Sequence, residues 1–296
     1  MVKERALPNS AVFVAIDPIS AKGTALFNEL MQVSNVRFIF VAEGLDSHAN
    51  YLMARKRGLV RQLLSADFGV LRRLADSIAK KSKANRSLIH QISDLAEVQG
   101  DGYYPERHYS VSSMSALSGA RVAQLDLLKV SKDRFAADAK TLRLFSEVDF
   151  GVLLSFNLIL SGPILETNWG VWSFHPADTF RYRGRPSCFW EFIDDAPFGV
   201  TLQRLAEQVD GGPVLAQRHL NLPKGKGRTL EQVRPTLEMF QLGMIPEALA
   251  TVQKSGGTDL PSPDVTTSRY HHQKDADRFL PSLRYLFKVV RNLMRR

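Results

Sequence analysis

Two short apolar runs near the N-terminus flank a segment with helical spacing. Residues 11–16 (AVFVAI) and 36–42 (VRFIFVA) are rich in Val, Ile, Phe and Ala, which is typical of buried strands. Residues 24–33, between them, space their apolar side chains as a helix does. A strand–helix–strand opening predicts a parallel sheet whose strands are joined by right-handed crossovers.

Later segments extend this pattern along the chain. Further strands are expected at residues 121–125, 150–156, 170–174, 199–205 and 214–220. Helices are expected at residues 136–145 and 229–252, the second beginning with a capping box formed by Thr229 and Gln232. No glycine-rich phosphate loop follows the first strand, so a dinucleotide-binding fingerprint is not expected. The sequence predicts an α/β fold with a Rossmann-like, mostly parallel sheet and helices on both faces.

Composition places the chain among ordinary globular proteins. Apolar residues make up 44% of the 296 residues and charged residues 23%. No apolar run is long enough for a transmembrane helix, and residues 1–10 lack the features of a secretory signal. Cys188 is the only cysteine, so no internal disulfide can form. We therefore expect a cytoplasmic protein.

The net charge of +9 is unevenly distributed. Residues 51–86 hold ten Lys/Arg and two Asp/Glu, and residues 274–296 hold seven and two, which leaves −4 for the remainder. A basic chain often binds nucleic acid. Because the surplus lies in two accessory segments here, a nucleic-acid partner is not favoured.

The same segments suggest the domain plan. We expect a single domain over residues 1–253 with a basic helical insertion at about 48–113, then a linker at 254–273 rich in Gly, Pro, Ser and Thr. A basic amphipathic helix over 274–296 follows. Its apolar positions are Leu283, Leu286, Phe287, Val290, Leu293 and Met294. This helix either packs its apolar stripe on the domain or makes peripheral contact with an anionic membrane surface.

The residues that carry chemistry lie between 155 and 220. Within the segment WSFHP, Ser173 and His175 point to the same side of a strand, since strand side chains alternate. A loop containing YRG follows, then GVTL from Gly199 and VDGGPVL from Val209. Each of these short motifs alone is typical of an ordinary turn or strand end. Their order and spacing are far more specific than any one of them.

The succession HP…YRG…GVTL…VDGGPVL resembles the folate-dependent formyltransferase domain. That family includes glycinamide ribonucleotide, methionyl-tRNA and sugar N-formyltransferases, and its pattern reads Asn-x-His-Pro-Ser, Tyr-x-Gly, Gly-Val-Thr and Asp-x-Gly-Pro. The resemblance covers roughly residues 121–252. It implies that His175 and Asp210 are catalytic and that Ser173 stands where the family has its catalytic asparagine.

The resemblance also implies binding residues. On the folate side they are Leu158, Ile159, Leu160, Glu207, Val209 and Asp210. On the acceptor side they are Tyr182, Arg183 and Gly184. His271 and His272 lack cysteine or acidic partners at metal-ligand spacing, so no metal site is expected. Cys188 is interpreted as a small buried apolar residue rather than a nucleophile.

The chemistry implied by the resemblance needs no protein nucleophile. An amine of the acceptor attacks the formyl carbon of 10-formyltetrahydrofolate, so the protein must stabilise an oxyanion and move protons. A histidine beside an aspartate suits both tasks near neutral pH. A serine hydroxyl is a shorter donor than the asparagine amide, and loss of one oxyanion donor typically costs about 10²–10³ in rate.

We therefore predict an N-formyltransferase that uses 10-formyltetrahydrofolate and a small amine acceptor, such as an amino sugar on a nucleotide or lipid carrier. The tRNA enzymes resemble this domain followed by a β-barrel domain, whereas residues after 252 read as linker plus helix. Two alternatives stay open. One is a hydrolase of the same fold that passes the formyl group to water. The other is a non-catalytic binding protein, for which Ser173 is the main argument.

Overall fold

The computed structural model describes residues 6–15, 19–42, 71, 74–75, 77–78, 108–131, 134–156, 158–166, 168–220 and 229–294. Within them, seven strands form one sheet in the order β11-β10-β8-β6-β1-β2-β3. The strands are β1 (Asn9–Val14), β2 (Asn35–Val41), β3 (Arg121–Gln124), β6 (Phe150–Leu153), β8 (Val171–His175), β10 (Phe198–Arg204) and β11 (Val214–Leu220). Strands β8, β6, β1, β2 and β3 pair in parallel, and β10 and β11 pair antiparallel. The predicted mostly parallel sheet is confirmed.

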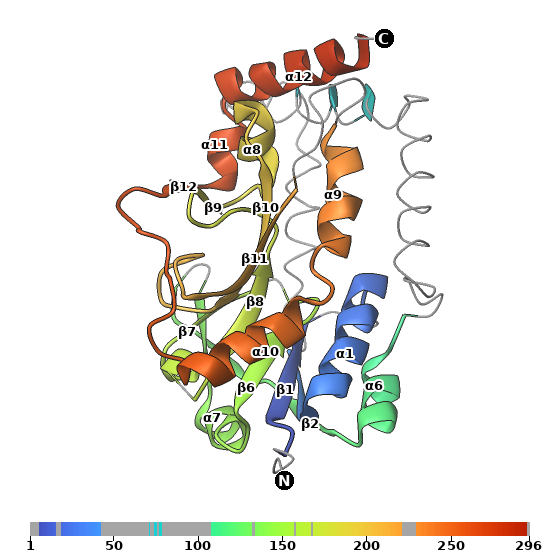
Figure 1. Ribbon diagram of the computed structural model, residues 1–296, viewed down its shortest axis with the longest axis vertical. Coiled ribbons are helices and arrows are strands. Elements are labelled where there is room, and N and C mark those ends of the chain that lie inside the picture. Colours follow the sequence, from blue (N-terminus) through green and yellow to red (C-terminus); the bar gives the residue numbers. More distant parts are fainter. Residues whose placement is uncertain are drawn as a thin grey trace.

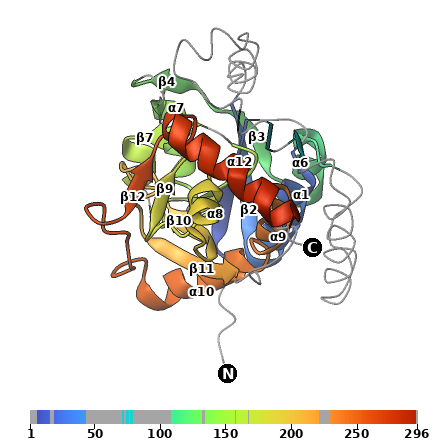
Figure 2. The same cartoon turned by 90° about the horizontal axis from the view of Figure 1, so that it is seen from above.

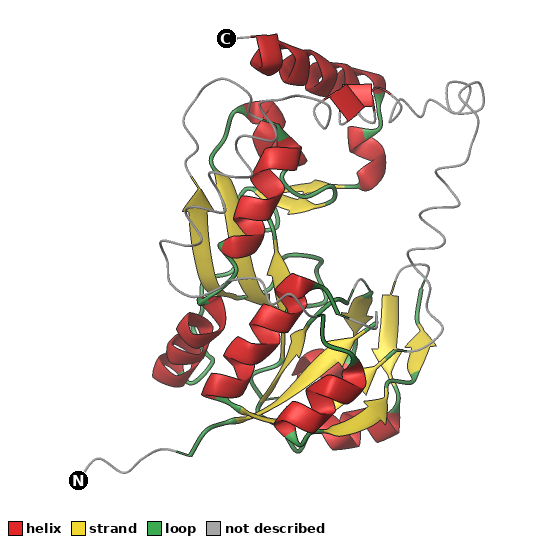
Figure 3. Cartoon of the chain, turned by 90° about the vertical axis from the view of Figure 1, so that its right-hand side faces the viewer, coloured by secondary structure: helices red, strands yellow, loops and turns green. Residues whose placement is uncertain are grey.

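The sheet has helices on both faces, as Figures 1 and 3 show. Alternation along β1 explains why: Val12 and Val14 enter one core, and Ala11 and Phe13 enter the other. The first core is covered by α1 (Ala21–Val33), α6 (Val111–Ser118), α9 (Leu230–Met239) and α10 (Met244–Ser255). The second is covered by α7 (Ala139–Phe145) and the short helix η1 (Pro163–Glu166). Each face therefore has its own apolar layer.

A second, three-stranded sheet was not expected from the sequence. It consists of β4 (Leu127–Lys129), β5 (Arg134–Ala137) and β7 (Ile159–Ser161). The helix predicted over residues 136–145 begins only at Ala139, because Asp138 caps it by accepting from the Thr141 N–H at 2.8 Å. The two preceding residues belong to β5 instead.

The helix predicted over residues 229–252 is divided into α9 and α10. Gly243 lies at the break with a φ of 79°, a conformation that favours glycine. The carboxylate of Glu29 on α1 accepts from the backbone N–H groups of Gly243 and Ile245 at 2.8 and 2.9 Å. These bonds satisfy donors at the start of α10 and tie it to α1.

Residues after α10 fold back on the domain. Strand β12 (Arg269–His271) pairs in parallel with β9 (Tyr182–Gly184), so part of the predicted linker is a strand. Helices α11 (Gln273–Ala276) and α12 (Phe279–Met294) follow, and α12 lies across α8 (Phe189–Asp194) (Figure 2). Lys288 of α12 pairs with Asp195 at 2.7 Å and donates to backbone carbonyls at the end of α8. The domain boundaries themselves remain a prediction.

The predicted basic insertion, about 48–113, lies mostly outside the described residues. Among the helices that the structure does describe, none is both long enough and apolar enough to span a membrane.

Candidate active site

Strands β8 and β10 position the predicted catalytic residues side by side. In their antiparallel register, His175 is opposite Thr201 and Ser173 is opposite Gln203. The intervening residues face the first core, where Leu202 is buried and Phe174 packs partly against it. The polar side chains therefore share the opposite face, at the carboxyl end of β8, where α/β sheets commonly bind ligands.

Asp210 reaches this face from the turn between β10 and β11. Its Oδ1 lies 3.4 Å from His175 Nδ1 and accepts from Gln203 Nε2 at 3.1 Å. Its Oδ2 accepts from the Gly184 N–H at 2.8 Å. The φ of Asp210 is 52°, an uncommon conformation that clusters at functional sites. The structure thus brings together two groups that are far apart in the sequence.

A close backbone approach in the same turn requires glycine at position 212. A Cβ there would lie 1.8 Å from the carbonyl oxygen of Arg204. The Arg204 N–H also donates to the Pro213 carbonyl at 2.8 Å. The Asp-Gly-Gly-Pro segment is therefore a tight turn that fixes the Asp210 carboxylate.

His175 has one ring nitrogen facing Asp210 and another without a partner. The residue is 8% exposed, and within the described part of the chain its Nε2 is buried with no hydrogen-bond partner. A buried polar atom of this kind costs free energy unless a ligand or water bonds it. Nε2 is therefore the ring nitrogen of His175 that has a hydrogen bond still to form.

The residues predicted to bind the acceptor mainly organise the loop around β9. Arg183 is buried and donates to the backbone carbonyls of Val209, Val265 and Ser268 at 3.1–3.4 Å. Tyr182 donates its hydroxyl to Asp194 at 3.2 Å, and burial together with Asp194 raises the pKa of Tyr182 to about 12. Gly184 has a φ of 88°, and a Cβ there would lie 2.0 Å from the His271 carbonyl oxygen. A direct role for these three residues in acceptor binding remains a prediction.

The residues predicted to bind folate come from two segments that meet. Leu160 is buried in the second core, and Leu158 packs partly against it, while Ile159 begins β7. Glu207 accepts from the Gly162 N–H just after β7 and pairs with Arg134 at 3.0 Å. The Val209 carbonyl accepts from Arg183, one residue before Asp210. The predicted folate side is therefore continuous with the His175–Asp210 pair.

Gln203 was not among the site residues predicted from the sequence. The available signal was the strand GVTLQ, in which Thr201 and Gln203 are polar at alternate positions between apolar residues. That alternation predicts a shared face for the two side chains.

A neighbouring polar cluster around Asp178 was not predicted either. The carboxylate of Asp178 lies 3.3 Å from His219 Nε2 and accepts from Gln217 at 3.0 Å. The backbone N–H of Asp178 donates to Glu191 Oε1 at 3.2 Å. Burial raises the pKa of Glu191 to about 8, against the hydrogen bonds that its carboxylate accepts from backbone N–H groups.

Cys188 is 2% exposed, and burial raises the pKa of its thiol above the ordinary range. Its Sγ lies 3.0 Å from the Pro176 carbonyl oxygen. A buried, protonated thiol is inert. These observations support its interpretation as a small packing residue.

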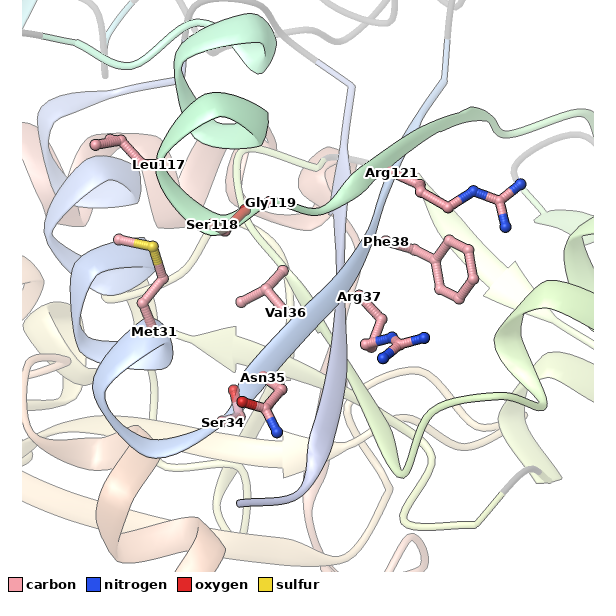
Figure 4. Close-up of a pocket in the computed structure, with 10 residues that line it drawn as sticks. All are labelled: Met31, Ser34, Asn35, Val36, Arg37, Phe38, Leu117, Ser118, Gly119 and Arg121. Atoms are coloured by element: carbon pink, nitrogen blue, oxygen red, sulfur yellow. The ribbon is translucent and has the colours of Figure 1, made fainter. Parts of the chain in front are cut away.

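Two hollows lie apart from this pair. One, of about 500 Å³, is lined by α1, β2, α6 and Arg121 at the far edge of the sheet (Figure 4). The other, of about 370 Å³, is lined by Glu207 and residues near η1. Neither lining includes His175 or Asp210. Among the described residues, no group of three or more His, Cys, Asp or Glu side chains could hold a metal ion.

The protein is an α/β protein in which His175 and Asp210 meet at the carboxyl end of β8. No family model matches the sequence. The resemblance to formyltransferases is nevertheless confirmed by curated relatives, which are methionyl-tRNA formyltransferases. The protein of Nitratidesulfovibrio vulgaris (strain DP4) is 30% identical over 187 residues, which is 61% of this chain and 55% of that protein. That of Parasynechococcus marenigrum (strain WH8102) is 35% identical over 78 residues, 26% of this chain and 23% of that protein.

The chain spans about half the length of the first of these relatives. Among solved structures, a 4-N formyltransferase from Francisella tularensis aligns over 95% of this chain and 87% of its own, with a TM-score of 0.49 and 10% identity.

Proposed function

We propose that this protein is an N-formyltransferase that moves a formyl group from 10-formyltetrahydrofolate to an amine of a small acceptor. The observation that carries the proposal is the pairing of His175 Nδ1 with Asp210 at 3.4 Å, while the buried Nε2 has no hydrogen-bond partner among the residues that the structure describes. The similarity to methionyl-tRNA formyltransferases supports the same reaction class.

The contacts of the site residues indicate a different role for each of them. In the reaction a C–N bond forms to the acceptor amine, the bond from the formyl carbon to N10 of the folate breaks, and one proton passes from the amine to N10. Asp210 holds the His175 ring so that Nε2 can donate to the formyl oxygen and move this proton. Backbone and side-chain donors from Gly184 and Gln203 keep the Asp210 carboxylate in place.

The predicted folate side fits this assignment. Glu207 joins the end of β7 to the turn that carries Asp210, and its side chain is 61% exposed, so it remains accessible to a ligand. Together with Leu158, Ile159 and Val209, it is proposed to hold the folate next to His175.

A small acceptor is supported by the course of the chain after α10. Residues around β12, α11 and α12 return to β9 and α8, and Arg183 bonds the Val265 and Ser268 carbonyls. They thereby pack against the loop that is proposed to contact the acceptor. An amino sugar on a nucleotide or lipid carrier is the proposed class.

Peripheral membrane contact through α12 is the second part of the proposal. Its outward stripe combines Leu280, Phe287 and Met294, which are 68%, 65% and 75% exposed, with the exposed Arg284 and Arg291. Exposed apolar side chains alternating with arginines suit an anionic lipid surface. Such contact would favour acceptors on a lipid carrier.

Formyl transfer from 10-formyl-labelled tetrahydrofolate to a panel of nucleotide-linked amino sugars tests the proposal. The wild-type chain should formylate at least one amine. Changing His175 to Ala should lower kcat by about 10²–10⁴-fold, because a general acid–base group is lost. Changing Asp210 to Asn should also lower kcat.

His219→Ala is the matched control, because His219 also lies 3.3 Å from an aspartate but is 44% exposed. It should retain activity within about threefold. Formate release without any amine would favour the hydrolase alternative. No turnover, with or without an amine, would contradict the proposal and favour a binding protein.

A further inference from the structure

The site lacks a carboxamide where the resemblance places one. Ser173 stands at that position on β8. A serine side chain is shorter than one that ends in a carboxamide. Its hydroxyl donates and accepts at one oxygen atom, whereas a carboxamide donates from its nitrogen and accepts at its oxygen. Another side chain on the same face could fill this role.

Gln203 is directly opposite Ser173 in the β8–β10 register. Facing side chains in an antiparallel pair have Cβ atoms about 4.5–5.5 Å apart, so a glutamine here reaches the space beside Ser173. A register shift between β10 and β11 occurs between Leu202 and Gln203. Such bulges redirect side chains next to active sites.

The contacts of Gln203 join it to both predicted catalytic residues. It is 1% exposed, and its Nε2 donates to Asp210 Oδ1 at 3.1 Å. The same carboxylate oxygen lies 3.4 Å from His175 Nδ1. Asp210 therefore has a fixed position between the imidazole and the carboxamide.

The other end of this carboxamide has no partner. In the described part of the chain, Gln203 Oε1 is buried without a hydrogen bond, as is His175 Nε2. Buried acceptors are nearly always bonded in folded proteins. Two unpaired polar atoms on side chains that share Asp210 indicate a place where a polar ligand completes the bonding.

We propose that Gln203 supplies, from the neighbouring strand, the carboxamide that is missing at Ser173. Its Nε2 positions Asp210, and its Oε1 orients the acceptor amine by accepting one of its N–H groups. This inference rests on the proposed formyl transfer. It assigns Gln203 to the recognition of the attacking amine.

Gln203→Ala should lower kcat by about 10²–10³-fold, the usual effect of losing one preorganised polar contact in the transition state. The KM for 10-formyltetrahydrofolate should stay within about threefold, because the lost contacts are to Asp210 and the amine. Adding Ser173→Asn to the Gln203→Ala variant should raise its kcat by at least about tenfold, since the asparagine returns a carboxamide to the same face. Ser173→Asn alone should change kcat by less than about threefold.

Gln241→Ala is the matched control. Gln241 is also 1% exposed with an unpartnered Oε1 in the described part of the chain, but it lies at the junction of α9 and α10. It should retain wild-type kcat. If Gln203→Ala does not fold, Gln203→Glu keeps the shape and removes the N–H donors, and it should lose activity to the same degree.

The outcomes separate the two proposals. An active wild type whose folded Gln203→Ala or Gln203→Glu variant keeps kcat within threefold overturns the role of Gln203 alone. A loss that Ser173→Asn does not relieve also overturns it. A wild type without formyl transfer overturns the proposed function, and the role of Gln203 in that reaction with it.

Discussion

Glu191 is a buried carboxyl group beside the proposed site. It is 1% exposed on α8, accepts from the Asp178 N–H, and has its pKa raised to about 8 chiefly by burial. Because the folded protein holds this proton more tightly than the unfolded chain, the stability contribution is complete below about pH 4.5. It is lost progressively as the pH rises to about 8.

Glu191→Gln should therefore remove much of the decline in unfolding free energy between about pH 5 and 8, because the amide keeps an acceptor oxygen but cannot ionise. Urea unfolding at a series of pH values measures this. The variant should gain stability over the wild type as the pH rises. Equal pH slopes for the two proteins would contradict the burial argument.

The order of the motifs predicted His175, Ser173 and Asp210 as site candidates, and the structure brings the first and last together. Gln203 was not predicted, because its contact depends on which residue lies opposite Ser173 across two strands. That register is a pairing between β8 and β10, which are separated in the sequence by β9 and α8, and no short motif records it. Arg183 was predicted from its place in the YRG motif, whereas its bonds to the Val265 and Ser268 carbonyls depend on the segment after α10.

At the scale of elements, α12 buries other side chains than the apolar stripe predicted for it, of which Phe287 and Met294 are exposed. Its inward face contains Tyr285, Val289 and Asn292, which are buried, together with Lys288, which is 8% exposed and anchored to α8. Its outward stripe keeps Leu280, Phe287 and Met294 exposed. The anchoring face can therefore hold the helix while the other remains free to contact lipid.

Changing Leu280, Phe287 and Met294 together to Ser should lower binding to phosphatidylserine-containing vesicles by at least about tenfold, because interfacial binding scales with buried apolar area. Vesicle sedimentation measures this, and pure phosphatidylcholine vesicles should bind the wild type more weakly.

The control changes three exposed apolar residues outside α12 to Ser: Leu117, Leu128 and Val130. Equal binding by both triple variants, or no binding by the wild type, would contradict a membrane role for α12.

Element prediction succeeded where the sequence pattern was strong. Strands β1, β2 and β6 were predicted because continuous apolar runs are buried on both faces of a parallel sheet. Strands β3, β8, β10 and β11 were predicted as short segments, the last three bounded by turn residues. Strands β4, β5 and β12 are only three or four residues long, and most of their residues are not buried. Their sequences therefore show little alternation of apolar and polar residues. Strand β12 exists because it pairs with β9, a contact between distant segments.

At the scale of the whole molecule, the sheet changes from parallel to antiparallel between β8 and β10, next to His175. The β4–β5–β7 sheet, with Glu207, lies on the side proposed to bind folate, and the β9–β12 pair contacts Asp210 through Gly184. The fold therefore offers two neighbouring regions on either side of one imidazole–carboxylate pair. This arrangement suits a reaction between two substrates.

The most direct test of a formyl-folate site at this pair is a calorimetric titration with 5-formyltetrahydrofolate, a stable relative of the proposed co-substrate. The account predicts saturable binding to one site by the wild type. Asp210→Ala should weaken it by at least about tenfold, because a charged hydrogen-bonding group is lost, and His219→Ala should leave it unchanged. Absence of binding by the folded wild-type protein, or equal affinity in Asp210→Ala, would contradict the account.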